Sequence, residues 1–223
     1  MTYRLTWLPT VLRDAGLKVV EVSGWQTRGH GDVGRIIGVI CHHTAYPSLA
    51  DNDDVNVVKR GRPDLKGPLS QLVLGRDGTY YMIAAGKAWH AGVGKWKGVT
   101  AGNNSFIGIE ACQRGYIKGP KAELWAPAQI DAYQKGCAAI LDYIKQPVTQ
   151  CIGHKEWAPG RKTDPTFSMP MFRDGVAFYM DNPKGTWRGA LDRMAARMTS
   201  PNSTEDGCRH DDVVGQKGKV VLC

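Results

Sequence analysis

The sequence lacks any stretch of about 18 consecutive apolar residues, the length that a membrane-spanning helix needs, so no stable membrane insertion is expected. The N-terminal segment also lacks the apolar core of a signal peptide. Arg4 and Arg13 interrupt it, and no small-residue cleavage site follows. We therefore expect a protein that is synthesised in the cytoplasm without a signal peptide.

Runs of five or more basic residues are also missing, although 29 Lys and Arg stand against 21 Asp and Glu, a net charge of +8. A basic surface attracts polyanions in general, including nucleic acid, anionic lipid and anionic cell-wall polymers. A dedicated nucleic-acid-binding arm normally shows as a run of like charges. We therefore expect no nucleic-acid partner, and charge alone does not choose among the other polyanions.

Cysteines in the CxxC arrangement of metal and redox sites are absent. Four of the six cysteines lie inside apolar runs, which predicts buried free thiols. The other two, Cys208 and Cys223, flank a polar segment, and their pairing in an oxidising compartment stays open. The first four are Cys41, Cys112, Cys137 and Cys151.

The chain does have the composition of a globular protein, with 42% hydrophobic residues over 223 positions, enough for one sizeable core. Helical and strand patterns mix along it without strict alternation. The expected fold class is therefore α/β, a mixed central β-sheet flanked by helices. The expected helices are residues 7–15, 52–60, 128–145 and 171–180, and the expected strands are 18–22, 35–45, a hairpin over 70–84, 105–112 and 151–154, with glycine–proline loops at 61–63 and 67–68.

The pattern weakens after Pro183, which sets the expected domain boundary. We expect a catalytic domain over residues 1–183, with an N-terminal extension at 1–34, and a C-terminal tail over 184–223. The tail would hold a short helix and a flexible polar segment. A monomer is expected.

Three polar groups stand where predicted strands end or in the loop that follows. They are His42 with His43 beside it, His154, and Asp164. Active sites of α/β folds usually assemble at such places. Two imidazoles and a carboxylate leave a fourth tetrahedral position open for water, as in catalytic zinc sites. The spacing matches no local metal motif, however, so three unrelated polar residues remain the alternative.

Glu110 interrupts the apolar run FIGIEAC, where a carboxylate must be paired or functional. Beside a metal it would act as a general base, and a salt-bridged structural glutamate is the alternative. Lys162 stands two residues before Asp164 and would stabilise an oxyanion there, unless it is an ordinary surface lysine. Trp89 and His90 lie in a glycine-rich loop and suit either ligand binding or anchoring of that loop.

Five blocks of the sequence resemble, in the same order, those of the type 2 N-acetylmuramoyl-L-alanine amidases. That family shares its fold with the peptidoglycan recognition proteins and includes many phage endolysins. The similarity covers roughly residues 20–175, and three of the blocks especially resemble the AmpD-like branch. The blocks are GVICHHTAY, SQLVLGRDGTYY, AWHAG, SFIGIEA and GHKEWAPGRKTDP.

The resemblance implies a zinc-dependent hydrolase that cleaves the amide bond between N-acetylmuramic acid and L-alanine. The endolysin role is expected, in which the enzyme acts on the cell wall after release from the cytoplasm. A cytoplasmic muropeptide-recycling amidase and a non-catalytic peptidoglycan-binding protein are the alternatives. The implied residues are zinc ligands His42, His154 and Asp164, catalytic acid/base Glu110, oxyanion stabiliser Lys162, and substrate-binding His43, Trp89, His90 and Arg161.

Two departures from related branches bear on this assignment. The branch that includes phage T7 lysozyme has a catalytic tyrosine ahead of the LVLGRDG strand, where this chain has Ser70 or Gln71. Many relatives have a cysteine as third ligand, where this chain has Asp164. The resemblance therefore implies that Glu110 takes over the catalytic proton transfer.

Overall fold

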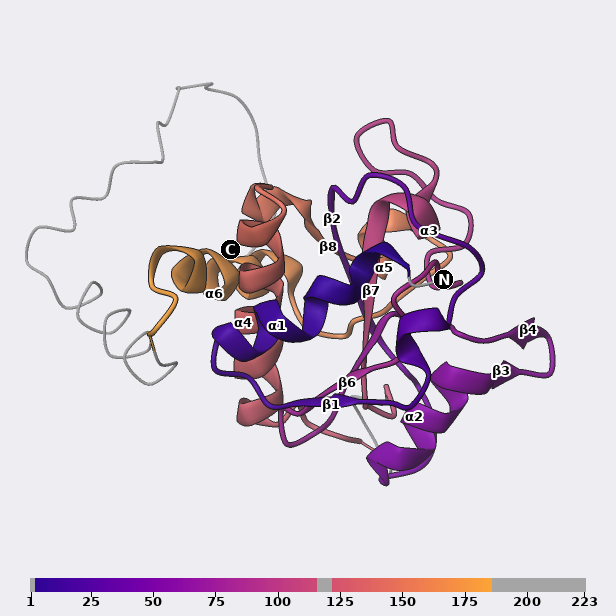
Figure 1. Ribbon diagram of the computed structural model, residues 1–223. Helices are drawn as coiled ribbons and strands as arrows, with labels where there is room; N and C mark the ends of the chain where they lie inside the picture. Colours follow the sequence, from indigo (N-terminus) through magenta and orange to yellow (C-terminus); the bar gives the residue numbers. More distant parts are fainter. Residues whose placement is uncertain (1–2, 116–121, 186–223) are drawn as a thin grey trace, which may run out of the picture. The chain divides into compact units, whose positions relative to one another are not determined.

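The computed structural model describes residues 3–115 and 122–185 and centres on a six-stranded sheet of strand order β1-β6-β5-β7-β2-β8 (Figure 1). β5 and β6 form an antiparallel hairpin, and the other neighbouring strands of this sheet pair in parallel. The expected mixed sheet is therefore confirmed. Its strands are β1 (Val19–Glu21), β2 (Gly38–His43), β5 (Leu72–Leu74), β6 (Tyr80–Met82), β7 (Phe106–Ala111) and β8 (Cys151–Gly153).

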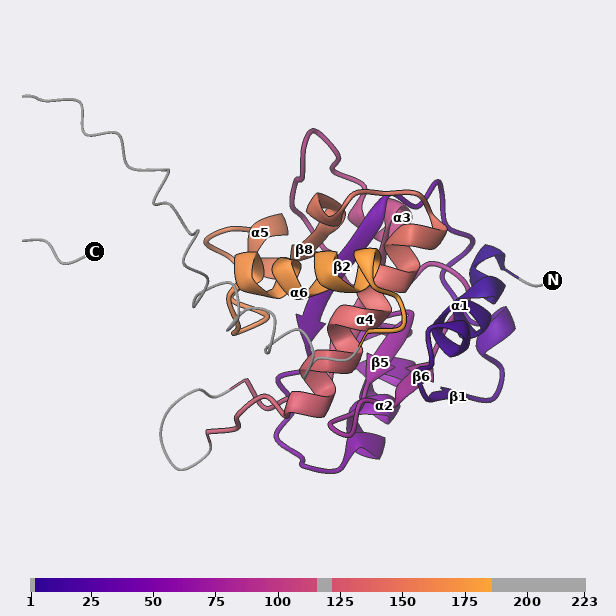
Figure 2. The same ribbon diagram turned by 90° about the vertical axis from the view of Figure 1, so that its left-hand side faces the viewer.

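Three helices cover one face of the sheet, and Figure 2 looks onto two of them, α4 and α6, in front of β2. Because side chains alternate along a strand, every second strand residue meets these helices. The main core forms there, around Leu12, Tyr133 and other fully buried side chains. The helices are α1 (Leu8–Asp14), α4 (Pro127–Tyr143) and α6 (Met169–Asp181). The chain also forms the short 3-10 helices η1 (Arg4–Trp7), η2 (Trp25–Thr27) and η3 (Val148–Gln150).

The opposite face of the sheet is covered by α2 (Asp51–Arg60) and by the short helices α3 (Gly102–Ser105) and α5 (His154–Trp157). Two smaller apolar clusters form on this side, one around Ile40 and one around Val73. Between them the strands carry polar residues, so this face holds the candidate chemistry. No helix among the described residues is long and apolar enough to cross a membrane.

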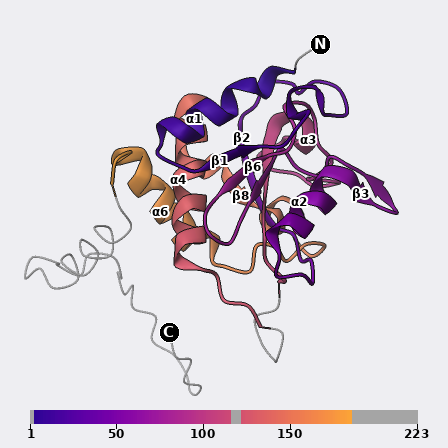
Figure 3. The same ribbon diagram turned by 60° about the horizontal axis from the view of Figure 1, so that its bottom comes forward.

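The glycine–proline segment after α2 is a small hairpin, not the expected irregular loop. β3 (Gly61–Arg62) and β4 (Leu65–Lys66) pair antiparallel and project from the end of α2 (Figure 3). Gly61 has φ of +94°, and a Cβ there would come within 2.2 Å of the Leu65 carbonyl oxygen. The close chain crossing therefore requires glycine, and strands of two residues are too short to show a period.

The other expected helices and strands within the described residues are confirmed, with small shifts at their ends. One correction matters for the site, because His154 does not end a strand but begins α5. The first four cysteines are buried free thiols, as expected, and Cys41 packs between Cys137 and Cys151 at Sγ distances of 3.8 and 3.7 Å. The tail over 186–223, with Cys208 and Cys223, lies outside the described residues.

Tyr133 fastens the longest helix to the sheet directly beneath the candidate site. The backbone N–H of His42 donates to its hydroxyl at 2.9 Å, and the hydroxyl donates to the Ile109 carbonyl at 2.8 Å. These bonds join α4 to β2 and β7 at once. Because all of these groups are buried, loss of the hydroxyl would leave a donor and an acceptor unpaired.

We therefore expect Tyr133→Phe to lower the free energy of unfolding by about 1–3 kcal/mol, the cost of orphaned buried polar groups. Tyr143→Phe on the same helix is the matched control. Its residue is 51% exposed and keeps its ring stacking on Trp7. Urea unfolding of both variants measures the difference, and equal midpoints would contradict the anchoring role of Tyr133.

Candidate active site

The ends of three parallel strands bring the candidate ligands together. His42 lies near the end of β2, opposite Glu110 of β7 in the strand register. β8, on the other side of β2, ends where His154 begins α5. Asp164 lies in the loop after α5, and its carbonyl accepts the Lys155 N–H at 2.8 Å, which folds that loop back over the strand ends.

Three donor atoms converge in this arrangement. The Nδ1 atoms of His42 and His154 lie 3.0 Å apart, and Oδ2 of Asp164 lies 3.3 Å from the first and 3.1 Å from the second. Tetrahedral zinc, with bonds of about 2.0–2.1 Å, separates its ligand atoms by about 3.3 Å. The spacing therefore fits one zinc ion, and the predicted set is found together.

The outer nitrogens of His42 and His154 are their Nε2 atoms, and the hydrogen-bond partners of these atoms indicate which ring nitrogens carry protons. His154 Nε2 lies 3.0 Å from the Ala91 carbonyl oxygen, which only accepts, so this nitrogen holds the proton. His90 Nε2 lies 3.2 Å from the Phe106 carbonyl, so a neutral His90 accepts at its Nδ1. That Nδ1 lies 3.2 Å from Nε2 of His42, which must donate.

In the neutral tautomers that these outer bonds favour, both Nδ1 atoms point lone pairs at each other and at the Asp164 carboxylate. Burial, and then the charge of His154, lower the pKa of His42 to about 4, so its imidazole is neutral at neutral pH. Three lone pairs at such distances repel one another unless a cation stands among them. The donor set consequently fits a divalent metal that accepts nitrogen and oxygen ligands.

Glu110 faces the same side of the sheet as His42. Burial, and then the negative charge of Asp164, raise its pKa to about 8, against the opposing charge of Lys162. Its Oε2 is buried without a hydrogen-bond partner among the described residues. A carboxyl group that holds a proton near neutral pH and has a free oxygen is suited to proton transfer.

A cavity of about 570 Å³ opens over the cluster, and every predicted site residue except His42 lines it. His43 is 8% exposed, and its Nδ1 has no partner within the described part of the chain. Trp89 stacks on His30 with centroids 4.5 Å apart. Arg161 donates to the carbonyl of Ala91 at 3.2 Å and also to that of Val93.

Other residues of the cavity wall were not expected from the sequence. Arg62 and Leu65 reach it from the β3–β4 hairpin, which the glycine–proline pattern concealed. Asn103 reaches it from α3 and binds the loop that carries His90. Glycine and proline around Arg62 mark a turn of some kind, but no signal in the sequence places that turn beside a site.

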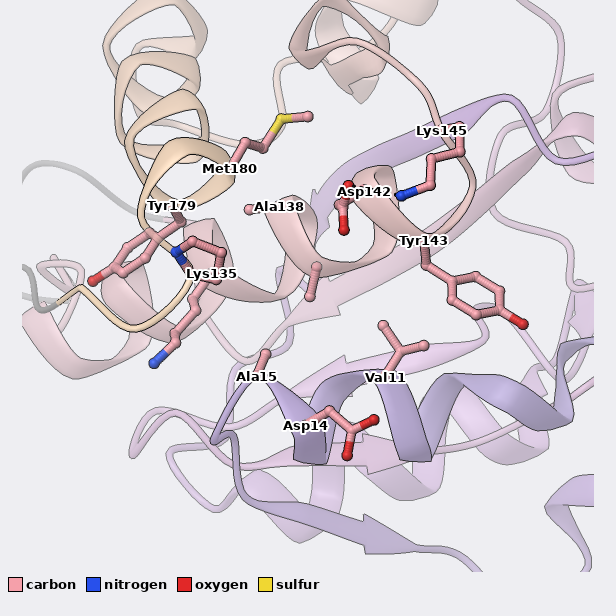
Figure 4. A pocket seen from close by; sticks show the side chains of 12 residues that line it. Val11, Asp14, Ala15, Lys135, Ala138, Asp142, Tyr143, Lys145, Tyr179 and Met180 are labelled. Carbon is pink, nitrogen blue, oxygen red and sulfur yellow. Dashed lines mark hydrogen bonds and ion pairs between the residues drawn. The ribbon is translucent and has the colours of Figure 1, made fainter.

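Another cavity, of about 450 Å³, lies among α1, α4 and α6 on the far face of the sheet (Figure 4). Its charged side chains include Asp142, which accepts from Lys145 at 3.1 Å, and Lys135, which lies 5.8 Å from the ring centre of Tyr179. It contains no histidine and no member of the candidate metal cluster. The candidate site residues therefore gather at the cavity over His42.

A known protein family matches the central part of the chain. Residues 32–167, more than half of the chain, match the family model described as N-acetylmuramoyl-L-alanine amidase. The matched range contains every predicted site residue.

Two curated relatives from Escherichia coli (strain K12) align with parts of the chain. N-acetylmuramoyl-L-alanine amidase AmiD is 37% identical over 81 residues, which cover 35% of this chain and 29% of AmiD. The 1,6-anhydro-N-acetylmuramyl-L-alanine amidase AmpD is 31% identical over 108 residues, which cover 47% of this chain and 56% of AmpD. The chain thus spans less than two thirds of either relative.

Solved structures share the fold. AmiD from E. coli, in complex with the substrate anhydro-N-acetylmuramic acid-L-Ala-D-gamma-Glu-L-Lys, superposes with a TM-score of 0.52 at 23% identity, over 83% of this chain and 82% of that one. The catalytic domain of XlyA gives 0.53 at 17% identity, over 72% of this chain and 99% of that one. The expected α/β fold is therefore confirmed.

The raised pKa of Glu110 predicts a pH-dependent stability of the metal-free protein. The folded chain keeps this proton up to about pH 8, whereas the unfolded chain loses it near the ordinary value of 4.5. Wild-type stability should therefore fall as pH rises through this window. Glu110→Gln removes the titratable carboxyl group. The free energy of unfolding of this variant, relative to that of the wild type, should therefore rise by about 1 kcal/mol or more as the pH rises through this window.

Thermal unfolding in a chelator, at several pH values across that window, measures the difference. Glu123→Gln is the control, because Arg76 and Arg114 hold the pKa of Glu123 below its ordinary value although burial opposes them. Its gap from the wild type should stay nearly constant across this window, because Glu123 is ionised in both the folded and the unfolded chain above its ordinary value of 4.5. A constant gap between Glu110→Gln and the wild type at every pH would contradict the prediction.

Proposed function

The chain belongs to the N-acetylmuramoyl-L-alanine amidase family, and we propose on this basis that it hydrolyses the amide bond between N-acetylmuramic acid and L-alanine in peptidoglycan or its fragments. The observation that carries the proposal is the convergence of three donor atoms, from His42, His154 and Asp164, beside an open cavity that His154 and Asp164 line. The arrangement is suited to a catalytic metal.

His42, His154 and Asp164 would hold zinc through two nitrogens and one carboxylate oxygen, a donor set typical of catalytic sites with an open position. Zinc bound there would lower the pKa of its water to about 7 and polarise the substrate carbonyl. The fit rests on the distances of 3.0–3.3 Å between the donor atoms and on the outer hydrogen bonds that fix both tautomers.

Glu110 takes the proton of the attacking water and returns it to the nitrogen of the leaving L-alanine, so it ends the reaction as it began. A pKa of about 8 in the metal-free site is close enough to neutral for both transfers. Lys162 places a positive charge beside the carbonyl oxygen that becomes anionic. Neither step forms a covalent bond to the protein, so no nucleophilic Ser or Cys is assigned.

His43, Trp89 and Arg161 would bind the substrate from the cavity wall. His43 offers an Nδ1 that has no partner among the described residues, and Trp89 offers an apolar ring held flat against His30. The guanidinium of Arg161 lies at the cavity wall, where it donates a hydrogen bond to the carbonyl of Ala91. The muramoyl peptide carries both apolar faces and carboxylates, which match these groups.

We propose the endolysin role because a net charge of +8 favours association with an anionic wall. The alternative is the recycling of soluble muropeptides. In either role, the boundary at Pro183 remains our proposal, with residues 1–183 as the catalytic domain and 184–223 as an accessory tail.

Two substitutions separate metal binding from proton transfer. His154→Ala should abolish activity and remove most of the bound zinc, because one of three protein ligands is lost. Glu110→Gln should lower turnover by about 100-fold or more while zinc stays bound. Metal analysis and hydrolysis of a soluble muropeptide measure both effects. Full activity of thoroughly chelated protein, or near-normal turnover of Glu110→Gln, would contradict the mechanism.

The two roles predict different substrates. An endolysin should clear intact sacculi at low salt and lose this activity as ionic strength rises, because the attraction to the wall is electrostatic. Its rate on soluble anhydro-muropeptide should change far less with salt. Turbidity and chromatographic assays measure the two rates. Fast hydrolysis of soluble anhydro-muropeptide with no clearing of sacculi would support recycling instead.

A further inference from the structure

The outer nitrogens of both histidine ligands reach the same dipeptide of the chain. His42 Nε2 lies 3.2 Å from the side chain of His90, and His154 Nε2 lies 3.0 Å from the backbone carbonyl of Ala91. The ligands themselves come from β2 and α5, which are more than a hundred residues apart. One short segment therefore sets the orientation of both rings.

The contacts of His90 are suited to orienting the ring of His42. It is 6% exposed, and its ring stands nearly perpendicular to that of His42, at 86° and 5.3 Å between centroids. Its second nitrogen is used up by the Phe106 carbonyl at 3.2 Å. Because that carbonyl only accepts, Nε2 of the neutral ring donates to it and Nδ1 is left to accept from His42.

Asn103 holds the dipeptide in place from α3. Its Oδ1 accepts the backbone N–H of His90 at 3.0 Å and that of Ala91 at 2.8 Å. Two bonds to adjacent amides fix both the position and the direction of this stretch of backbone. The carbonyl that meets His154 is thereby aimed as well.

Gly108 makes room for the same ring on the surface of the sheet. It lies on β7 opposite Ile40 in the register, and a Cβ at this position would come within 2.6 Å of Cγ of His90. The imidazole therefore rests directly on the backbone of β7. Glycine in the middle of a strand weakens the strand. The close contact with His90 explains why a glycine nevertheless occurs at position 108.

We propose that His90 and Asn103 are positioning residues of the metal site, which hold His42 and His154 with protonated Nε2 and with Nδ1 lone pairs aimed at the metal. The proposal rests on the zinc site of the proposed function. It gives His90 a role behind a ligand rather than the substrate contact expected from the sequence. Asn103 has no role in any expectation drawn from the sequence.

Two substitutions of His90 separate acceptor chemistry from packing. His90→Leu keeps much of the volume but removes the acceptor, so zinc affinity should fall by about 10- to 100-fold. In His90→Asn the side-chain oxygen takes the place of Nδ1 and can accept from His42, so most of the affinity should return. Competition with a chromogenic chelator measures affinity, and the visible spectrum of the cobalt-substituted protein reports the ligand geometry.

A second pair of variants tests the anchor. Asn103→Ala removes both bonds to the dipeptide and should weaken zinc binding and alter the cobalt spectrum. Asn104→Ala is the matched control on the same helix, because its side chain has no hydrogen bond within the part of the chain described here, while its backbone bonds remain. Asn104→Ala should bind zinc as the wild type does. This pair keeps the test decisive if His90→Leu fails to fold.

The outcomes distinguish this inference from the proposed function. If the wild type binds no zinc, the proposed function fails, and the inference with it. If the wild type binds zinc and His90→Leu and Asn103→Ala match its affinity and cobalt spectrum, the inference is overturned while the proposed function stands. If His90→Asn binds as weakly as His90→Leu, the ring acts by packing, and the tautomer argument is overturned.

Discussion

The convergence of two imidazole nitrogens and one carboxylate oxygen is the constraint on which this site depends. Carbonyl oxygens cannot donate, so the carbonyls of Ala91 and Phe106 fix where the imidazole protons lie, and they do so at the outer edge of the site. In these tautomers the inner nitrogens direct their lone pairs toward one point and repel one another unless a cation binds there. The fold must therefore hold His42, His154 and Asp164 against their mutual repulsion, and the rest of the molecule can be understood as the means of doing so.

The sheet supplies most of that rigidity through the alternation of its side chains. On β2, Cys41 points into the core beneath α4, and His42 therefore points to the opposite face. On β7, Ile109 and Glu110 divide in the same way, so that the carboxyl group lies level with His42. Tyr133 then bonds both strands from below. On each strand a core residue and a candidate site residue are thus adjacent in the chain, so the packing of the core also fixes the position of the site residue.

The sequence predicted the parts of this arrangement that leave a local mark. An apolar run ending in His42 and another interrupted by Glu110 indicate buried strands with functional ends, and the amidase-like blocks implied the ligand set. Asn103 and Ala91 leave no such mark, because one acts through a common amide and the other through a backbone carbonyl. His90 was visible, but its side-chain direction depends on Gly108, which is distant in sequence. Such contacts are tertiary, and no periodic pattern encodes them.

The separation of the ligands along the chain has a consequence for synthesis. His42 and Asp164 are 122 residues apart, and His154 follows an edge strand that pairs with β2 alone. A nascent chain that has not yet released β8 from the ribosome has the other five strands of the sheet but only one of the three candidate ligands, His42. Contacts of such long range form late in folding. A fragment that ends before β8 therefore lacks His154 and Asp164, and the candidate metal cluster is complete only when the segment from β8 to Asp164 has joined the sheet.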